Sequence, residues 1–172
     1  MKTNQKGVKM ELRGDTEIVF TRYFAARREL VFDCHTKPEL MRRWLIGPEG
    51  MTLDTCEVDL KVGGKYLFVY ADAKGNRFGI YGNYREVNAP EKVTNTENYA
   101  TDMPTFNLKT AVEDPNAMVE ARTFTTEGDL TLMTHVCKFT SAEGRKIAME
   151  TNLADGMGEF YQPLDKLLSE LS

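Results

Sequence analysis

The sequence predicts an α+β fold in which a curved antiparallel β-sheet wraps around a long C-terminal helix. First, the apolar residues of segment 155–172 recur in steps of three and one, which makes one continuous stripe on a helix. Second, most of the preceding chain alternates strand-like segments with short turns, a pattern typical of antiparallel sheets. Third, the helical patterns are segregated from the strands. Because an apolar stripe needs a surface to cover, we expect a pocket between this helix and the sheet.

Length and composition favour one soluble globular domain. The chain has 172 residues, of which 41% are hydrophobic and 28% charged, with a formal net charge of −4. This charge balance predicts no nucleic-acid partner, and the apolar runs are far shorter than the roughly 18 residues of a membrane span. We assign residues 17–172 to a single domain and residues 1–16 to an N-terminal leader, which is either solvated or an additional strand. Three widely spaced cysteines predict reduced thiols and a cytoplasmic location.

The first strand and two short helices open the domain. Residues 17–25 are rich in β-branched and aromatic side chains and predict a strand. Residues 27–36 have apolar residues at helical spacing. A second short helix is expected over residues 37–44, because Pro38 suits the first turn of a helix.

Six further strands follow, separated by turns that contain glycine, asparagine or proline. They are expected at residues 51–60, 65–71, 77–87, 92–100, 117–126 and 129–139. Residues 102–116 show no clear period and predict a long surface loop. A capping-box pattern predicts a short helix from about residue 140 to 151. In the last helix, Pro163 should remove one backbone hydrogen bond at a cost of about 3 kcal/mol, so we expect a kink near residues 159–162.

Several motifs in order resemble those of one known family. They are Thr21-Arg22-x-Phe24-x-Ala26-x-Arg28-Glu29-Leu30-Val31-Phe32-Asp33, Arg43-Trp44, Gly82-x-Tyr84-x-Glu86 and Leu164-Asp165-x-x-Leu168. The chain resembles, over about residues 17–171, the activator-of-Hsp90-ATPase-homologue-1-like family of the START/Bet v 1-like superfamily (SRPBCC). This resemblance implies a helix-grip fold, in which a curved sheet grips the C-terminal helix around a cavity. Arg27 departs from the family pattern, which usually has proline there.

Pairing in the first predicted hairpin assigns its faces. With the turn centred on Lys74-Gly75, Phe68 lies opposite Tyr81, and directly opposed residues share a face. The face that also carries Tyr66 and Tyr70 is aromatic and has no lysine, so we expect it to point at the helix. Leu67, Val69, Ile80 and Tyr84 then belong to the other face.

Pairing in the last predicted hairpin is argued in the same way. With the turn centred on Glu127-Gly128, Thr123 lies opposite Leu132 and Ala121 opposite Thr134. This face is uncharged and is expected to point inward. The opposite face, with Glu120 facing His135, is expected to point outward, although a slip of one residue would reverse these assignments.

The predicted pocket combines these faces with the helix. Its lining is expected to be Tyr66, Phe68, Tyr70, Tyr81, Thr123, Leu132 and Thr134 from the sheet, and Met157, Phe160, Tyr161 and Leu164 from the helix, with Trp44 closing one end. An apolar wall with scattered hydroxyl groups is typical of a small-molecule cavity, and equally of a filled core. Both alternatives stay open at this point.

The sequence offers little for catalysis or metal binding. His35 and His135 are the only histidines, and no spacing typical of a metal or cofactor site is present, so we predict neither. His135 and Cys137 lie two residues apart on one strand, about 7 Å at Cα, which we take as too far for a Cys–His nucleophile pair. No catalytic residue is predicted.

We therefore expect a non-catalytic protein that binds a small apolar or aromatic molecule between the sheet and the C-terminal helix. A first alternative, implied by the resemblance, is stimulation of the ATPase of an Hsp90-type chaperone through protein binding. A second is an enzyme, such as a cyclase or hydrolase, on the same fold. A binder needs an enclosed cavity of at least about 300 Å³, whereas an enzyme needs a titratable residue with a perturbed pKa on the pocket wall.

Overall fold

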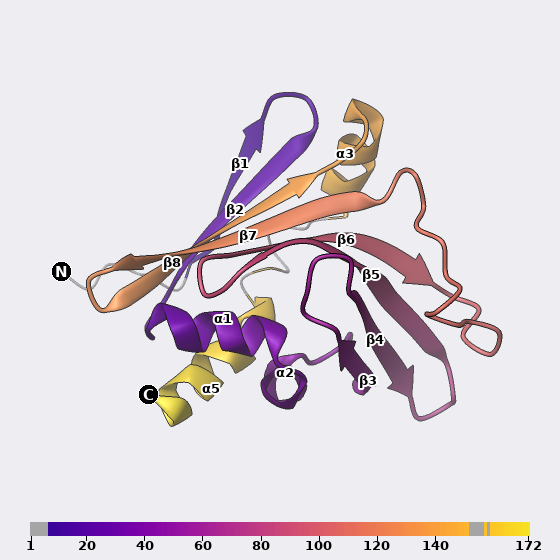
Figure 1. The fold of residues 1–172 in the computed structure, drawn as a ribbon, viewed down its shortest axis with the longest axis horizontal. Coiled ribbons are helices and arrows are strands. Elements are labelled where there is room, and N and C mark those ends of the chain that lie inside the picture. The colour runs from indigo at the N-terminus through magenta and orange to yellow at the C-terminus, as the bar shows by residue number, and fades with distance from the viewer. Residues whose placement is uncertain (1–6, 152–156, 158) are drawn as a thin grey trace.

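A single antiparallel sheet of eight strands forms the body of the protein (Figure 1). The computed structural model describes residues 7–151, 157 and 159–172. The strands are β1 (Lys9–Arg13), β2 (Glu17–Phe24), β3 (Met51–Val58), β4 (Lys65–Asp72), β5 (Arg77–Asn88), β6 (Lys92–Ala100), β7 (Met118–Glu127) and β8 (Leu130–Lys138). Their order across the sheet is β1-β2-β8-β7-β6-β5-β4-β3, so β2 closes onto the last strand of the meander. The predicted α+β class is confirmed.

Helices α1 (Arg28–Thr36), α2 (Pro38–Trp44) and α5 (Gln162–Leu171) lie together against the sheet, whereas α3 (Ala142–Met149), which follows β8, lies apart from them (Figure 1). Pro38 occupies the first turn of α2, as predicted. Ser141 caps α3, and its hydroxyl oxygen accepts a hydrogen bond from the backbone N–H of Gly144 (3.0 Å).

The C-terminal helix is shorter than the sequence predicted. Met157, Glu159 and Phe160 are helical, a turn follows at Tyr161, and α5 begins at Gln162. Pro163 therefore lies in the first turn of a new helix, where its missing N–H costs no hydrogen bond. The helix predicted over residues 155–172 is divided at Tyr161, within the range where the kink was expected, and the kink is a boundary between two helical segments. Residues 155, 156 and 158 of that segment lie outside the described residues.

The apolar stripe of α5 forms the centre of the core. Leu164, Leu167 and Leu168 are all at most 3% exposed. They pack with aromatic residues from α1, α2 and the sheet in one cluster, which includes Phe24, Phe32, Trp44, Phe124 and Tyr161. The expectation that this helix covers one face of the sheet is confirmed.

Part of the N-terminal segment is a strand. Residues 9–13 form β1, which pairs with β2 from Lys9 opposite Thr21 to Arg13 opposite Glu17. All five residues of β1 are exposed. The N-terminal segment was expected to be either solvated or an additional strand, and residues 9–13 form the additional strand.

The register of the β4–β5 hairpin differs by one residue from the prediction. Tyr70 pairs with Phe78 and Phe68 with Ile80, which places Tyr81 opposite Leu67 on the other face. The cause is the turn, where the Asp72 carboxylate accepts hydrogen bonds from the backbone N–H groups of Lys74 and Asn76 (both 2.9 Å). Ile80 and Tyr84 thus share the inner face with Tyr66, contrary to the prediction.

The β7–β8 hairpin has the predicted face groupings but the opposite orientation. Glu127 pairs with Leu130 around a two-residue turn at Gly128, which shifts the pairing by two residues and leaves the faces unchanged. The charged face with Glu120 and His135 points inward, because these groups satisfy one another inside the protein. The predicted inward residues Thr123, Leu132 and Thr134 lie on the other face and are half-buried.

Candidate functional site

A cavity of about 790 Å³ lies on the inner side of the sheet. Aromatic side chains of β4 and β5 form one wall, and residues of α2, α3 and the segment before α5 form the other. Its lining includes Phe20, His35, Trp44, Tyr66, Phe68, Tyr70, Ile80, Tyr84, Glu97, Tyr99, Glu120, Arg122, His135, Cys137, Ile147, Met157, Phe160 and Tyr161. The interior of the protein is therefore not filled by its own side chains.

Most residues predicted for the pocket border this cavity. They are Trp44, Tyr66, Phe68, Tyr70, Tyr81, Met157, Phe160 and Tyr161. Tyr81 does so from the other face of β5, where its ring packs on Phe106 with centroids 4.9 Å apart. Leu164 is fully buried in the core, outside the lining. That these residues bind a ligand stays a prediction.

Trp44 is held rigidly at the cavity wall. Its indole N–H donates a hydrogen bond to the backbone carbonyl of Cys34 (2.7 Å). Its ring stacks on Tyr161, with centroids 6.1 Å apart, and meets Phe160 edge-on at 5.5 Å. The break before α5 thus brings Phe160 and Tyr161 onto Trp44, and the three rings close this part of the cavity.

Tyr66 reaches across the sheet because a glycine lies opposite it. Tyr66 pairs with Gly82, where any Cβ atom would lie 2.1 Å from the carbonyl oxygen of Thr96. The Tyr66 hydroxyl donates to that carbonyl (2.5 Å) and accepts from the side-chain amide of Asn95 (3.2 Å). Burial raises the pKa of Tyr66, so its hydroxyl stays neutral.

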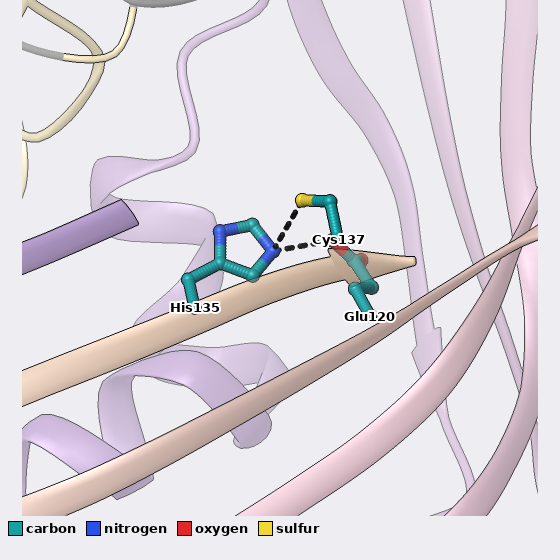
Figure 2. A group of neighbouring side chains, drawn as sticks. All are labelled: Glu120, His135 and Cys137. Atoms are coloured by element: carbon teal, nitrogen blue, oxygen red, sulfur yellow. Dashed lines mark hydrogen bonds and ion pairs between the residues drawn. The ribbon is translucent and has the colours of Figure 1, made fainter. Parts of the chain in front are cut away.

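A buried polar cluster occupies the β7–β8 part of the wall, and three of its members are drawn in Figure 2. One carboxylate oxygen of Glu120 lies 2.8 Å from Nε2 of His135 and 3.2 Å from a guanidinium nitrogen of Arg122. Its other oxygen accepts from the amide of Asn95 (3.0 Å). Burial opposes the charge on Glu120, but Arg122 and His135 outweigh it and hold the pKa of Glu120 far below its usual range. Glu120 is therefore an ionised carboxylate inside the protein.

The two histidines at the cavity are neutral at pH 7. Burial, reinforced by the charge of Arg122, lowers the pKa of His35 to about 3. The same two causes lower the pKa of His135, although Glu120 opposes them. His35 Nδ1 lies 2.8 Å from the carbonyl of Val31, which fixes that nitrogen as the N–H donor of the neutral ring.

Glu97 is a second carboxyl group on this wall. It lies on β6 opposite Met118, and the hydroxyl of Tyr99 donates a hydrogen bond to it (2.5 Å). Burial and the charge of Glu120 raise the pKa of Glu97 to about 7. A titratable group with a perturbed pKa on the cavity wall is what the enzyme alternative required.

The side-chain atoms of Cys137 and His135 lie closer together than the sequence-based prediction expects. Their side chains point to the same side of β8 and bring Sγ within 3.4 Å of Nε2. The expectation that the Cα spacing keeps them apart is therefore wrong. However, burial and the charge of Glu120 raise the pKa of Cys137, so it is a thiol and not an activated nucleophile.

The same three residues have the donor atoms of a metal site. The ligand atoms of Glu120, His135 and Cys137 lie within 4.8 Å of one another, a convergence that the sequence prediction missed. The cation of Arg122 already binds the same Glu120 oxygen as His135, which opposes a second cation there. Among the described residues, Nδ1 of His135 also has no acceptor of the kind that usually orients a metal-bound histidine.

Sequence reasoning missed the polar part of the wall. Asn95, Glu97, Glu120, Arg122, His135 and Cys137 were all absent from the predicted lining. The predicted pairing of Glu120 with His135 contains the signal, but a strand face that carries charges predicts an outer face. A cross-strand pair of opposite or complementary polarity is equally consistent with a buried network.

The sequence matches, over residues 25–169, the family described as "Activator of Hsp90 ATPase homolog 1-like protein". The chain belongs to this family. This confirms the resemblance seen in the motifs. A search of curated proteins finds no match.

Solved structures similar to this family member share its fold along nearly the whole chain. A protein from Rhodobacter sphaeroides has a TM-score of 0.80 at 21% identity, with 96% of this chain and 99% of that one covered. A protein from Staphylococcus epidermidis has a TM-score of 0.77 at 23% identity, with 95% of each chain covered. A protein from Nitrosomonas europaea has a TM-score of 0.75 at 23% identity, covering 92% and 97%. At these identities the likeness shows the helix-grip fold alone.

Among the described residues, no helix is both long enough and apolar enough to cross a membrane.

Proposed function

We propose that this family member binds a small, largely apolar or aromatic molecule in the cavity between the sheet and the helices. The observation that carries the proposal is the cavity itself. Its volume of about 790 Å³ lies within the range of roughly 300–1,000 Å³ typical of ligand pockets. Aromatic rings from β4, β5, α2 and the segment before α5 supply the apolar contact area.

The polar groups of the wall would orient the ligand. Ligand pockets are mostly apolar and contain a few placed polar groups that give specificity. Here Asn95, Glu97, Glu120, Arg122 and His135 bring polar groups to a largely aromatic wall, and among the described residues Glu97 has no ion-pair partner. An unpaired polar group in such a surface is costly, so a ligand that hydrogen-bonds to one of these groups gains affinity over one that does not.

Trp44 provides a direct test of ligand binding, because it is the only tryptophan and it borders the cavity. We expect the neutral probe 1-naphthylmethanol to quench its fluorescence in a saturable manner. Ile80→Phe, which adds bulk on the inner face of β5, should weaken binding of the probe severalfold. Val62→Phe is the matched control, because Val62 is exposed on a turn away from the cavity.

Native mass spectrometry of the purified protein provides an independent test. A co-purifying small molecule that is released on denaturation would support the proposal. Absence of such a molecule, together with no quenching by the probe in the unmodified protein, would overturn it.

A second candidate function is stimulation of an Hsp90-type chaperone. The observation that favours it is the family match, since the description of the family names activation of the Hsp90 ATPase. It predicts that addition of this protein raises the ATPase turnover of a purified Hsp90. An unchanged turnover at saturating protein would exclude this candidate and leave the binding proposal standing.

A further inference from the structure

The charges that border the cavity are unbalanced. The charged side chains in the lining are Glu97, Asp114, Glu120 and Arg122, and both histidines are neutral at pH 7. Arg122 is engaged by Glu120 at 3.2 Å. The single cation is therefore already paired, and negative charge remains on the wall.

Glu97 is the uncompensated group. Its hydrogen-bond partner is the neutral hydroxyl of Tyr99, and within the described part of the chain no lysine, arginine or histidine lies within ion-pair distance of it. Across the sheet it faces Met118, and the nearby ionised Glu120 on β7 repels its charge. Glu97 is half-buried, and a partly desolvated carboxylate without a counter-charge is costly; proteins relieve this cost by taking up a proton or a cation.

Aromatic residues line the same cavity as Glu97, and one of them, Tyr99, contacts it directly through its hydroxyl group. Tyr84 and Tyr99 border the same cavity as Glu97, and Ile80 pairs directly with Tyr99 across the strands. Aromatic faces attract cations and accommodate planar apolar groups. The surface next to Glu97 is thus suited to a cation that is attached to an aromatic body.

We propose that the ligand is an aromatic or apolar molecule that carries a protonated amine, and that Glu97 accepts the ammonium group. This inference rests on the proposed function and specifies the ligand class of the same cavity. An ammonium group beside Glu97 supplies the counter-charge that the protein itself does not. An anionic ligand would meet the uncompensated carboxylate of Glu97 and bind more weakly than a neutral one.

The titration of Glu97 agrees with this geometry. Burial and Glu120 favour the protonated form of Glu97 in the ligand-free protein, with a pKa of about 7. The other groups that face it are Arg122, which is paired, and on β8 neutral His135 and the thiol of Cys137. An ammonium ligand favours the ionised form, so binding should release a proton near neutral pH.

Three probes of similar shape and different charge distinguish a cationic, a neutral and an anionic ligand. Their dissociation constants are measured by isothermal titration calorimetry at pH 8, and the probes are 1-naphthylmethylamine, 1-naphthylmethanol and 1-naphthoate. We expect the amine to bind roughly tenfold or more tightly than the alcohol, as a charge-assisted hydrogen bond predicts, and the carboxylate to bind most weakly. Between pH 6 and pH 8 the affinity for the amine should rise about tenfold, while that for the alcohol stays constant.

Glu97→Gln should abolish both the preference for the amine and its pH dependence, while the alcohol still binds. The retained binding of the alcohol shows that the variant is folded. Glu57→Gln, at an exposed position of β3, is the matched control and should behave as the unmodified protein does. Equal binding of amine and alcohol would overturn the ligand class and leave the cavity proposal intact. Failure of all three probes to bind would overturn the proposed function itself.

Discussion

Arg22 and Asp165 lie 143 residues apart in the chain and form a two-pronged ion pair, with nitrogen–oxygen distances of 2.8 and 2.6 Å. The pair joins β2 to the first turn of α5. The guanidinium group of Arg22 also lies over the rings of Phe24 and Tyr161, at 4.8 and 5.4 Å from their centroids. Arg22 belongs to the first and Asp165 to the last of the sequence motifs that indicated the family, so this ion pair joins the two motifs in the folded protein.

Replacing Asp165 by alanine should destabilise the protein strongly. The side chain of Arg22 is only 1% exposed, so it would remain buried without its counter-charge. We expect the free energy of unfolding to fall by about 3 kcal/mol or more, measured by urea denaturation. Glu170→Ala is the matched control on the same helix, because Glu170 and its partner Arg43 are both about half exposed. The control should cost less than about 1 kcal/mol, and equal losses in the two variants would contradict this account.

The positions of the strands and helices could be predicted because they depend on local pattern. Each predicted strand and helix from residue 17 to residue 151 is present, within about two residues at most boundaries. The exception at the C-terminus is instructive. The apolar stripe continues through Pro163, so periodicity alone joined two helical segments that the proline separates at Tyr161.

The inner face of the sheet could not be predicted, because it depends on turn geometry and on long-range pairing. The hydrogen bonds of Asp72 set the β4–β5 register, and they moved Tyr81 to the other face. The orientation of the β7–β8 hairpin follows from the pairing of β8 with β2, which places Phe20 opposite His135. A search for uncharged faces then selects the wrong side. Glu120 and Arg122 neutralise each other, and neutral His135 hydrogen-bonds to the carboxylate, only in the folded protein.

His35 should make the protein sensitive to acid. Burial lowers its pKa to about 3 in the folded state, whereas the unfolded chain has the ordinary value of about 6.5. Below pH 6.5 the unfolded state takes up a proton that the folded state does not. The contribution of neutral His35 to the free energy of unfolding is therefore fully present above pH 6.5 and is lost progressively towards pH 3. At pH 5 the loss from His35 amounts to about 2 kcal/mol.

The variant His35→Phe tests this origin, because it keeps an aromatic ring among Phe24, Trp44 and Phe124. Between pH 7 and pH 5, the free energy of unfolding measured in urea should fall by about 2 kcal/mol less in this variant than in the unmodified protein. His135, whose pKa is also lowered, accounts for part of the remaining loss. The same pH dependence in both proteins would show that His35 is not its source.

The three cysteines should be unreactive in the folded protein. All are buried, and burial raises the pKa of Cys34 to about 11 and also raises those of Cys56 and Cys137. Because the thiolate is the reactive form, Ellman's reagent at pH 8 should react slowly before denaturation and with all three thiols in concentrated urea. Val62→Cys on an exposed turn is the positive control and should add one fast-reacting thiol. Rapid reaction of a native thiol would contradict the assigned burial.

Glu97 should lower the stability of the ligand-free protein at alkaline pH. Its folded pKa of about 7 lies above the ordinary value of about 4.5, so the unfolded state ionises first as the pH rises. The free energy of unfolding therefore falls between about pH 4.5 and pH 7 and is constant above that range, with a total loss of up to about 3 kcal/mol.

The variant Glu97→Gln tests this origin, because glutamine has nearly the same shape and no charge. It should be more stable than the unmodified protein at pH 8 and equally stable at pH 4.5. Urea unfolding at the two pH values measures the difference, and Glu57→Gln should show none. A Glu97→Gln variant that is less stable at pH 8 would show that the carboxylate is compensated in the folded protein, which would also remove the basis for an amine ligand.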